Sequence, residues 1–221
     1  LKRNTEVFKS IIDPVTSSGF NGIFLVATNP VDIMTRITCT LSGFNPRRVL
    51  GTGTALDTAR LRYLLGEYLK VDPRNIHAYV MGEHGDTEFV PWSQAMVATK
   101  SITELCEESH GSICAQELEQ ISEEVRTAAY KIIEAKNATY YGIGMALTRI
   151  TKAILGNEHS VLTVSAMLRG EYGQSGIFTG VPCIINQNGV QRVLPLSLSE
   201  EESEKLEQSC QILKRSYEEL E

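Results

Sequence analysis

The chain has 221 residues, of which 42% are hydrophobic and 22% charged. This length and composition allow a sizeable buried core and exclude an intrinsically disordered protein. The net charge of -6, from 21 basic and 27 acidic residues, excludes typical nucleic-acid binding and attraction to an anionic membrane, because no surplus of basic side chains is present.

The cysteines indicate the redox compartment of the protein, and the apolar runs bear on whether it spans a membrane. Five cysteines are scattered along the chain, and none forms a C-x-x-C pair. This distribution predicts neither a disulfide framework nor a zinc site, and it favours a reducing, cytoplasmic compartment. The longest apolar runs, such as residues 22–27, are too short to span a bilayer, and no secretory signal is visible.

The first 53 residues alternate helical and strand patterns. Apolar residues at helical spacing predict a helix over residues 3–18, and the apolar run at 22–28 predicts a strand buried on both faces of a parallel sheet. A helix over 31–42 and a strand over 48–52 follow, so this part predicts an α/β layer. Two parallel strands do not form a stable sheet alone. Either the rest of the sheet is missing, or this segment docks elsewhere.

The remaining residues mix helices and strands in a less regular order. Helices are predicted at 57–70, 117–136 and 140–155, and a last helix opens with the capping box of Ser199 and Glu202. Strands are predicted at 76–81, 160–168, 182–186 and 190–194, with a hairpin turn at Asn188-Gly189. The fold class is therefore α/β followed by α+β.

The segment Gly-Thr-Gly-Thr-Ala-Leu at residues 51–56 lies between a predicted strand and a predicted helix. A dinucleotide-binding loop needs a third glycine where this chain has Leu56. No acidic residue follows a second strand at the distance expected for a ribose contact. We therefore assign no phosphate-binding loop here.

His84 is the first candidate for chemistry. It follows a predicted strand and lies between two glycines in Gly-Glu-His-Gly-Asp, residues 82–86. Glycines allow a ligand to approach closely, and a histidine titrates near neutral pH, so His84 is a candidate acid or base. An exposed histidine in an ordinary turn explains the same pattern.

Other polar residues lie at predicted element ends. Asp57 opens a helix, where capping alone explains an aspartate, and Arg60 lies one turn further on the same face. Arg60 is either a carboxylate ligand or a solvated arginine. Asn29 follows the buried strand, at the edge where α/β sheets bind ligands. Arg62 and His77 could together bind an anion, but alone they support no assignment.

Taken together, these segments resemble the L-lactate dehydrogenases. The resemblance is carried by residues 27–32 (Ala-Thr-Asn-Pro-Val-Asp), 53–62, 77–88, 137–142 and 181–182. It covers essentially the whole chain, and the motifs are specific as an ordered set. The related malate dehydrogenases typically have glycine where this chain has Glu83, which favours the lactate enzymes.

The resemblance implies roles in the interconversion of pyruvate and L-lactate. His84 would be the proton donor and acceptor, and Asp57 would bind its other ring nitrogen and stabilise the charged form. Arg60 would bind the substrate carboxylate. Asn29 would contact the substrate oxygen and the nicotinamide, and Thr139 would line the substrate pocket. The cofactor, NAD, would bring the hydride and the histidine the proton.

The resemblance also implies a cofactor surface and an effector site. Ala27, Thr28, Asn29 and Thr52 would line the nicotinamide. Arg62 and His77 match the pair that binds fructose bisphosphate in allosteric bacterial members, at a subunit interface of a homotetramer. Oligomerisation with copies of itself is therefore expected.

The chain departs from the family in one large respect. It contains no G-x-G-x-x-G, and the mobile loop with a second catalytic arginine is not found in it. We expect residues 1–53 to be the tail of a Rossmann-type dinucleotide-binding domain and residues 54–221 to be the substrate domain. The alternatives are a malate or other 2-hydroxy-acid dehydrogenase, and a folded, self-associating fragment without catalysis.

Overall fold

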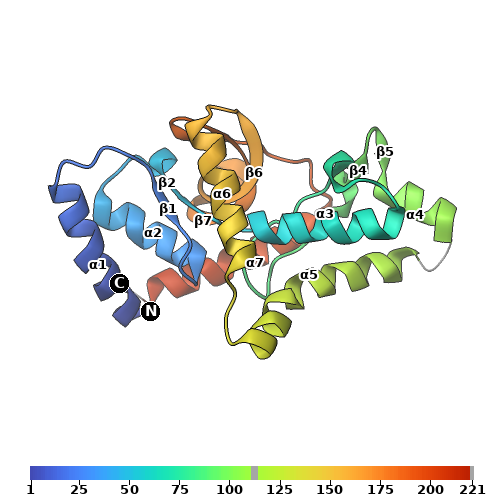
Figure 1. The fold of residues 1–221 in the computed structure, drawn as a ribbon, viewed down its shortest axis with the longest axis horizontal. Helices are drawn as coiled ribbons and strands as arrows, with labels where there is room; N and C mark the ends of the chain where they lie inside the picture. Colours follow the sequence, from blue (N-terminus) through green and yellow to red (C-terminus); the bar gives the residue numbers. More distant parts are fainter. Residues whose placement is uncertain (111–113, 220–221) are drawn as a thin grey trace.

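The computed structural model describes residues 1–110 and 114–219 of the chain. Figure 1 shows helices α1 and α2 beside strands β1 and β2 at one end, and helices α3, α4 and α5 at the other. Strands β6 and β7 and helix α6 lie between these groups, and α7 runs beneath them. No helix within the described ranges is long and apolar enough to cross a membrane.

The first part has the predicted order of elements. Helix α1 (Lys2–Ser17), strand β1 (Phe24–Val26), helix α2 (Val31–Ser42) and strand β2 (Val49–Gly51) follow one another, and the two strands pair in parallel. The prediction of a strand buried on both faces is wrong for β1, in which only Val26 is buried. The reason is its position: among residues 1–110 and 114–219, β1 pairs with β2 alone and lies at the edge of the sheet.

The parallel pair is part of a larger mixed sheet. Strands β6 (Ser160–Arg169), β7 (Ser175–Asn186) and β8 (Gly189–Val193) complete the order β1-β2-β6-β7-β8. Strand β2 joins β6 antiparallel through the pair Gly51–Ser165. A Cβ on Gly51 would lie 2.3 Å from Thr35 Oγ1 and 2.9 Å from Ser165 Cβ, so only glycine allows this approach. The two predicted strands therefore dock on the C-terminal strands.

The other helices divide between this large sheet and a small second one, with the last two on the large sheet and the first two on the small one. They are α3 (Ala55–Leu69), α4 (Ile102–His110), α5 (Cys114–Lys136), α6 (Tyr141–Leu155) and α7 (Glu200–Glu218), which begins with the predicted capping box. The small sheet has the order β3-β4-β5, with β3 (Ile76–His77), β4 (Met96–Val97) and β5 (Lys100–Ser101). The strand predicted over 76–81 is thus only two residues long, because Met81 instead pairs with Phe89 in an isolated bridge.

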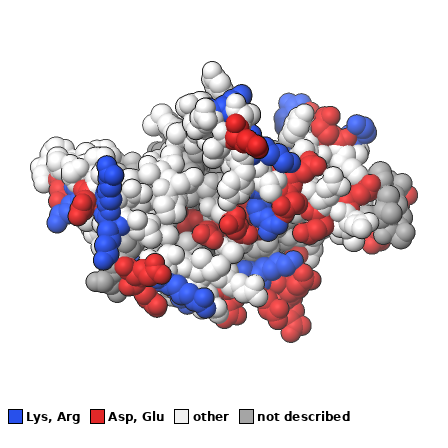
Figure 2. All heavy atoms as spheres, turned by 90° about the horizontal axis from the view of Figure 1, so that it is seen from below, with Lys and Arg blue, Asp and Glu red and all other residues white. Residues whose placement is uncertain are grey.

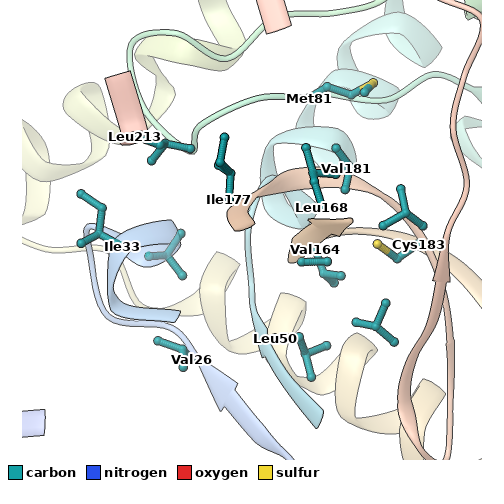
Figure 3. Close-up of a cluster of buried hydrophobic side chains, with 14 of the residues drawn as sticks. Val26, Ile33, Leu50, Met81, Val164, Leu168, Ile177, Val181, Cys183 and Leu213 are labelled. Atoms are coloured by element: carbon teal, nitrogen blue, oxygen red, sulfur yellow. The ribbon is translucent and has the colours of Figure 1, made fainter. Parts of the chain in front are cut away.

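Two hydrophobic cores hold these layers. The central core, between the large sheet and helices α2, α6 and α7, includes Leu50, Val164, Ile177 and Leu213 (Figure 3). The lateral core joins α3, α4 and α5 through side chains such as Leu61, Ile102 and Leu118.

The structure corrects one expectation drawn from the cysteines. Cys106 of α4 and Cys114 of α5 form a disulfide, with Cα atoms 5.5 Å apart. Cys39, Cys183 and Cys210 are free. The pairing depends on two helices that fold back on each other, and α4 was not predicted. The scattered spacing of the cysteines therefore gave no sign of it.

The surface charges are mixed in sign. On the face shown in Figure 2, lysines and arginines alternate with aspartates and glutamates, and no continuous basic stripe is visible.

Candidate active site

The loop that carries His84 is anchored in both cores. Before the loop, Val80 faces the lateral core and Met81 the central one; after it, Phe89 faces the central core and Val90 the lateral one. This alternation is the two-residue period of an extended chain. The backbone pairs of Met81 with Phe89 close the base of the loop. Residues 82–88 therefore project from a rigid stem.

A pair of glycines fixes the loop against the large sheet. Gly82 and Gly180 of β7 exchange two backbone hydrogen bonds of 2.9 Å. A Cβ on Gly180 would lie 2.6 Å from Thr54 Oγ1, and Gly82 has a φ of +97°, which favours glycine. Ser209 of α7 also accepts a 2.7 Å hydrogen bond from the amide of Glu83. The loop is thereby held from β7 and α7 at once.

Asp32 positions the backbone of His84. Its carboxylate accepts a 2.8 Å hydrogen bond from the His84 amide and a 2.5 Å hydrogen bond from Ser165 Oγ of β6. Asp32 lies in the first turn of α2, directly after β1, and it is buried. Burial raises the pKa of Asp32 to about 6, although both hydrogen bonds oppose this rise. Reasoning from the sequence gave Asp32 no role; its place after the buried strand was the available signal.

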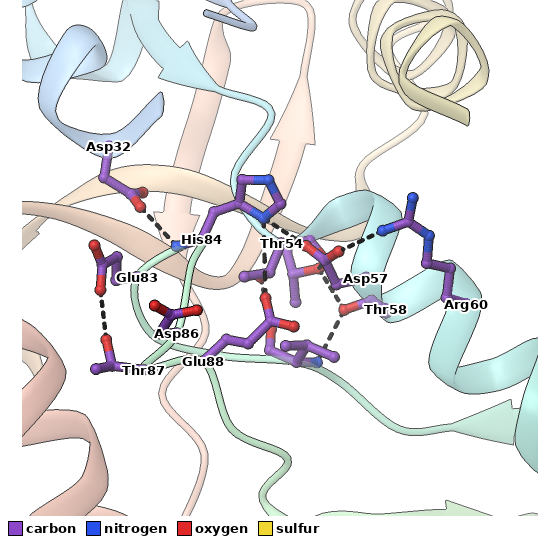
Figure 4. A network of polar contacts seen from close by, with 12 residues as sticks. Asp32, Thr54, Asp57, Thr58, Arg60, Glu83, His84, Asp86, Thr87 and Glu88 are labelled. Atoms are coloured by element: carbon purple, nitrogen blue, oxygen red, sulfur yellow. Dashed lines mark hydrogen bonds and ion pairs between the residues drawn. The ribbon is translucent and has the colours of Figure 1, made fainter. Parts of the chain in front are cut away.

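The structure brings His84, Asp57 and Arg60 together; the resemblance implied the contact of Asp57 with His84. His84 Nδ1 and Asp57 Oδ2 are 2.7 Å apart, and Arg60 Nη1 donates to Asp57 Oδ1 at 3.1 Å (Figure 4). The Asp57 side chain is 3% exposed, against 23% for His84 and 18% for Arg60. The carboxylate is thus buried behind an imidazole and a guanidinium that both reach solvent.

The surroundings of His84 favour its charged form. Burial lowers its affinity for the proton, but the hydrogen bond and charge of Asp57, with the charges of Glu88 and Asp32, outweigh burial. The pKa of His84 is raised to about 9. Among the described residues, no hydrogen bond engages Nε2, so this nitrogen is available to give or take a proton.

Glu88 is a further member of this cluster that the sequence did not reveal. Its side chain is 6% exposed, and Oε2 lies 3.9 Å from His84 Nδ1. Burial and the charge of Asp57 raise the pKa of Glu88 to about 8, against the opposing effect of His84. We assign no metal to this cluster, because Nδ1, the nitrogen that faces both carboxyl groups, is engaged by Asp57 in a short hydrogen bond.

The predicted cofactor residues lie at the carboxyl edge of β1 and β2. Thr28 and Asn29 are exposed, Ala27 is half-buried and Thr52 is buried, with its amide bonded to the Val26 carbonyl at 2.8 Å. Exposed hydroxyl and amide groups at this edge fit the carboxamide end of a nicotinamide. The sequence contains no glycine-rich loop that would bind the cofactor's phosphates. The residues at this edge therefore fit the nicotinamide end of the cofactor.

Thr139, predicted to line the substrate pocket, lies in the link between α5 and α6 and is half-buried. None of the hydrogen bonds and ion pairs found in residues 1–110 and 114–219 joins it to His84, Asp57 or Arg60. The structure therefore does not bring it into the polar network.

Arg62 and His77 lie on adjoining elements without a polar contact between them in the described structure. Arg62 donates to the Ala78 carbonyl at 3.0 Å and lies 5.0 Å over the Tyr79 ring, and its pKa is lowered by burial. His77 is exposed on β3. Arg62 also lines a hollow of about 430 Å³ between α3, α6 and β6, together with Arg74 and Arg149.

The fold and the site define an α/β protein with a buried acid–base pair beside a guanidinium suited to a carboxylate. Residues 1–51 match the lactate/malate dehydrogenase NAD binding domain, and residues 54–221 match the lactate/malate dehydrogenase alpha/beta C-terminal domain. The chain belongs to the lactate/malate dehydrogenase family. NAD is accordingly its cofactor, as the resemblance implied.

The relatives are lactate dehydrogenases. L-lactate dehydrogenase 2 of Bacillus cereus is 52% identical over 216 residues, a match that covers 98% of this chain and 68% of the relative. The minor L-lactate dehydrogenase of Enterococcus mundtii, solved with ligands bound, superposes with a TM-score of 0.93 at 47% identity, covering 100% of this chain and 70% of that one. A lactate dehydrogenase from a Medee basin deep-sea metagenome gives a TM-score of 0.95 at 46% identity, covering 99% and 70%.

Proposed function

We propose that this chain carries about two thirds of an NAD-dependent L-lactate dehydrogenase, including its catalytic residues, with His84 as proton donor and acceptor. The observation that carries the proposal is the 2.7 Å contact of His84 Nδ1 with a carboxylate that is 3% exposed. A buried carboxylate in this position fixes the orientation of the ring and stabilises its charged form. The 52% identity to an L-lactate dehydrogenase supports the same reaction.

Each polar group then has one task in the reduction of pyruvate. NAD, when bound, supplies the hydride. His84 Nε2 gives a proton to the substrate's keto oxygen, while Asp57 retains its hydrogen bond to Nδ1. Arg60 keeps one nitrogen on Asp57 and directs its remaining N–H groups to the substrate carboxylate, where charge-assisted hydrogen bonds contribute about 1.5–3 kcal/mol each. Oxidation of lactate returns the proton to His84 Nε2.

The other predicted contacts belong to this proposal. Asn29 would contact the substrate oxygen, and Thr139 would line the substrate pocket. Ala27, Thr28 and Thr52 would line the nicotinamide. We also propose the boundary between the dinucleotide-binding and substrate domains at residues 53 and 54.

The choice of pyruvate over oxaloacetate rests on the relatives and on Glu83. The Glu83 carboxylate accepts a 2.6 Å hydrogen bond from Thr87 Oγ1, so it stabilises its own loop and leaves the substrate side to His84 and Arg60. Malate dehydrogenases, the alternative, typically have glycine there. Preference for oxaloacetate in the assay below would favour that alternative.

The alternative from another class is a folded, self-associating chain without turnover, favoured by the lack of a glycine-rich phosphate loop. The test is oxidation of NADH by the purified chain, with pyruvate or oxaloacetate, and with its intact mass checked. We expect micromolar or tighter NADH binding and turnover only after the chain is joined to the loop-bearing segment of the Bacillus cereus relative. Turnover by the 221 residues alone would contradict this expectation.

Assembly and regulation are part of the proposal. We propose a homotetramer in which Arg62 and His77 bind fructose bisphosphate and thereby raise the affinity for pyruvate. The proposal is supported by their residue types and by their proximity, because Arg62 donates to the carbonyl of Ala78, the residue after His77. Sedimentation with and without the effector tests the association.

A further inference from the structure

Glu88 is a buried carboxyl group to which the proposed reaction gives no task. It lies four residues after His84 in the same loop, and its side chain is 6% exposed. None of the hydrogen bonds found within the described residues ends on its carboxylate. Its nearest polar partner is His84 Nδ1, at 3.9 Å, on the side of the ring that also faces Asp57 (Figure 4).

Charged groups from four elements surround Glu88. The groups that act on it electrostatically are Asp57 and Arg60 of α3, His84 of its own loop and Arg126 of α5. Glu119 of α5 and Lys205 of α7 line the same hollow as Glu88, and Asp32 of α2 acts on His84. Arg126 is itself paired with Glu123 and bonded to the Asp86 carbonyl. Within the described residues, the cation that forms an ion pair with Glu88 is the imidazolium of His84.

The short distance between Glu88 and His84 makes the protonation of each depend on the charge of the other. The carboxyl groups of Asp57 and Glu88 and the imidazole of His84 have ligand atoms within 4.8 Å of one another, and the two carboxyl side chains are 3% and 6% exposed. A negative charge on Glu88 stabilises the proton on His84, and loss of that proton makes a charge on Glu88 less favourable, because Asp57 is already negative. Burial and Asp57 keep the pKa of Glu88 near 8, so it ionises over the same pH range in which His84 would otherwise lose its proton.

Glu88 also has its own route to solvent. It lines a hollow of about 290 Å³ between residues 86–92, α5 and α7, on whose wall Glu119 and Lys205 also lie. Its proton can therefore exchange with bulk water without passing the Nε2 side of His84, where the substrate binds in the proposed reaction.

We propose that Glu88 is a positioning residue whose carboxylate, 3.9 Å from Nδ1, keeps His84 protonated into the alkaline range. Asp57 holds the ring through its hydrogen bond to Nδ1, and Glu88 places a second carboxylate near the same nitrogen. The inference rests on the proposed function, in which the charged form of His84 is the proton donor.

The test measures the titration of His84 by NMR in this 221-residue chain, with its signal assigned by its loss in H84Q. A full charge 3.9 Å away, at an effective dielectric constant near 20, displaces a titration midpoint by up to roughly three pH units. We expect E88Q to lower the His84 midpoint by about one pH unit or more. E88D, which retains the charge on a shorter side chain, should give an intermediate midpoint.

The matched control is E119Q, which removes one negative charge from the wall of the same hollow. It should leave the His84 midpoint unchanged. An unchanged or raised midpoint in folded E88Q would overturn the proposal, as would equal shifts in E88Q and E119Q. If E88Q fails to fold, E88A takes its place, and an unchanged midpoint in folded E88A overturns the proposal. The measurement needs no turnover, so its failure is distinct from a failure of the lactate dehydrogenase assignment.

Discussion

Replacing Asp57 with asparagine removes the charge that stabilises protonated His84 and keeps the shape of the side chain. The rise of the His84 pKa from 6.5 to about 9 corresponds to about 3 kcal/mol between the two protonation states. With Asp57→Asn, burial of His84 continues to disfavour the charge. Glu88 and Asp32 continue to favour the charge, so we expect the midpoint of His84 to fall from about 9 to below 8.

The assay is the NMR titration of His84 in the chain and in the D57N variant. D13N, which changes an exposed aspartate of α1, is the matched control and should leave the midpoint near 9. A midpoint that stays above pH 8 in folded D57N would refute the reasoning, because the charge of Asp57 would then not be what holds the proton.

The raised pKa of His84 also makes the free energy of unfolding decrease as the pH rises. A raised pKa in the folded state means that His84 binds its proton more tightly when the chain is folded. This stabilisation is fully present below pH 6.5 and is lost as the pH rises to about 9. Urea denaturation should therefore show a free energy of unfolding that decreases by up to about 3 kcal/mol over this range. The decrease should be smaller in D57N; an equal decrease in both proteins would exclude His84 as its source.

Two further predictions concern a glycine and the proposed effector site. Gly180→Ala should lower the free energy of unfolding by about 1–3 kcal/mol, because its Cβ would lie 2.6 Å from Thr54 Oγ1. Gly144→Ala in α6, with open space at its Cβ, is the control and should be neutral or stabilising in the same denaturation experiment. In the loop-completed enzyme, R62Q and H77Q should each abolish the effect of fructose bisphosphate on pyruvate affinity. Unaltered activation curves in both variants would reject that site.

Local sequence patterns were sufficient for much of the fold. The helical periodicity of residues 31–42 and the capping box at Ser199 coincide with α2 and with the start of α7. Helix α4 was missed, because its nine residues carry few apolar side chains. The docking of β2 on β6 depends on one pair of residues, Gly51 and Ser165, which are far apart in the chain. A pattern of local periodicity contains no information on such a pair.

The candidate site, like the fold, was predictable from the sequence only in part. Residue type and place at element ends made His84, Asp57 and Arg60 candidates but left a turn histidine, a helix cap and a solvated arginine as alternatives. The resemblance to the lactate dehydrogenases selected them. The groups that hold and tune His84 come from elsewhere in the chain: Asp32 precedes it by 52 residues, and Ser165 lies 133 residues from Asp32. Glu88 is close in sequence, but only the bend of the loop places it beside the ring. Burial, which decides the charge of each group, follows from the packing of both cores.

The most direct test of the central claim is pyruvate-dependent oxidation of NADH by the chain joined to the loop-bearing segment of its Bacillus cereus relative, with and without His84→Asn. The account predicts turnover with pyruvate, and a fall in kcat of about 10²–10⁴-fold in the variant, while NADH affinity is kept. A folded variant that reduces pyruvate at the rate of the unmodified protein would contradict the assignment of His84 as the proton donor.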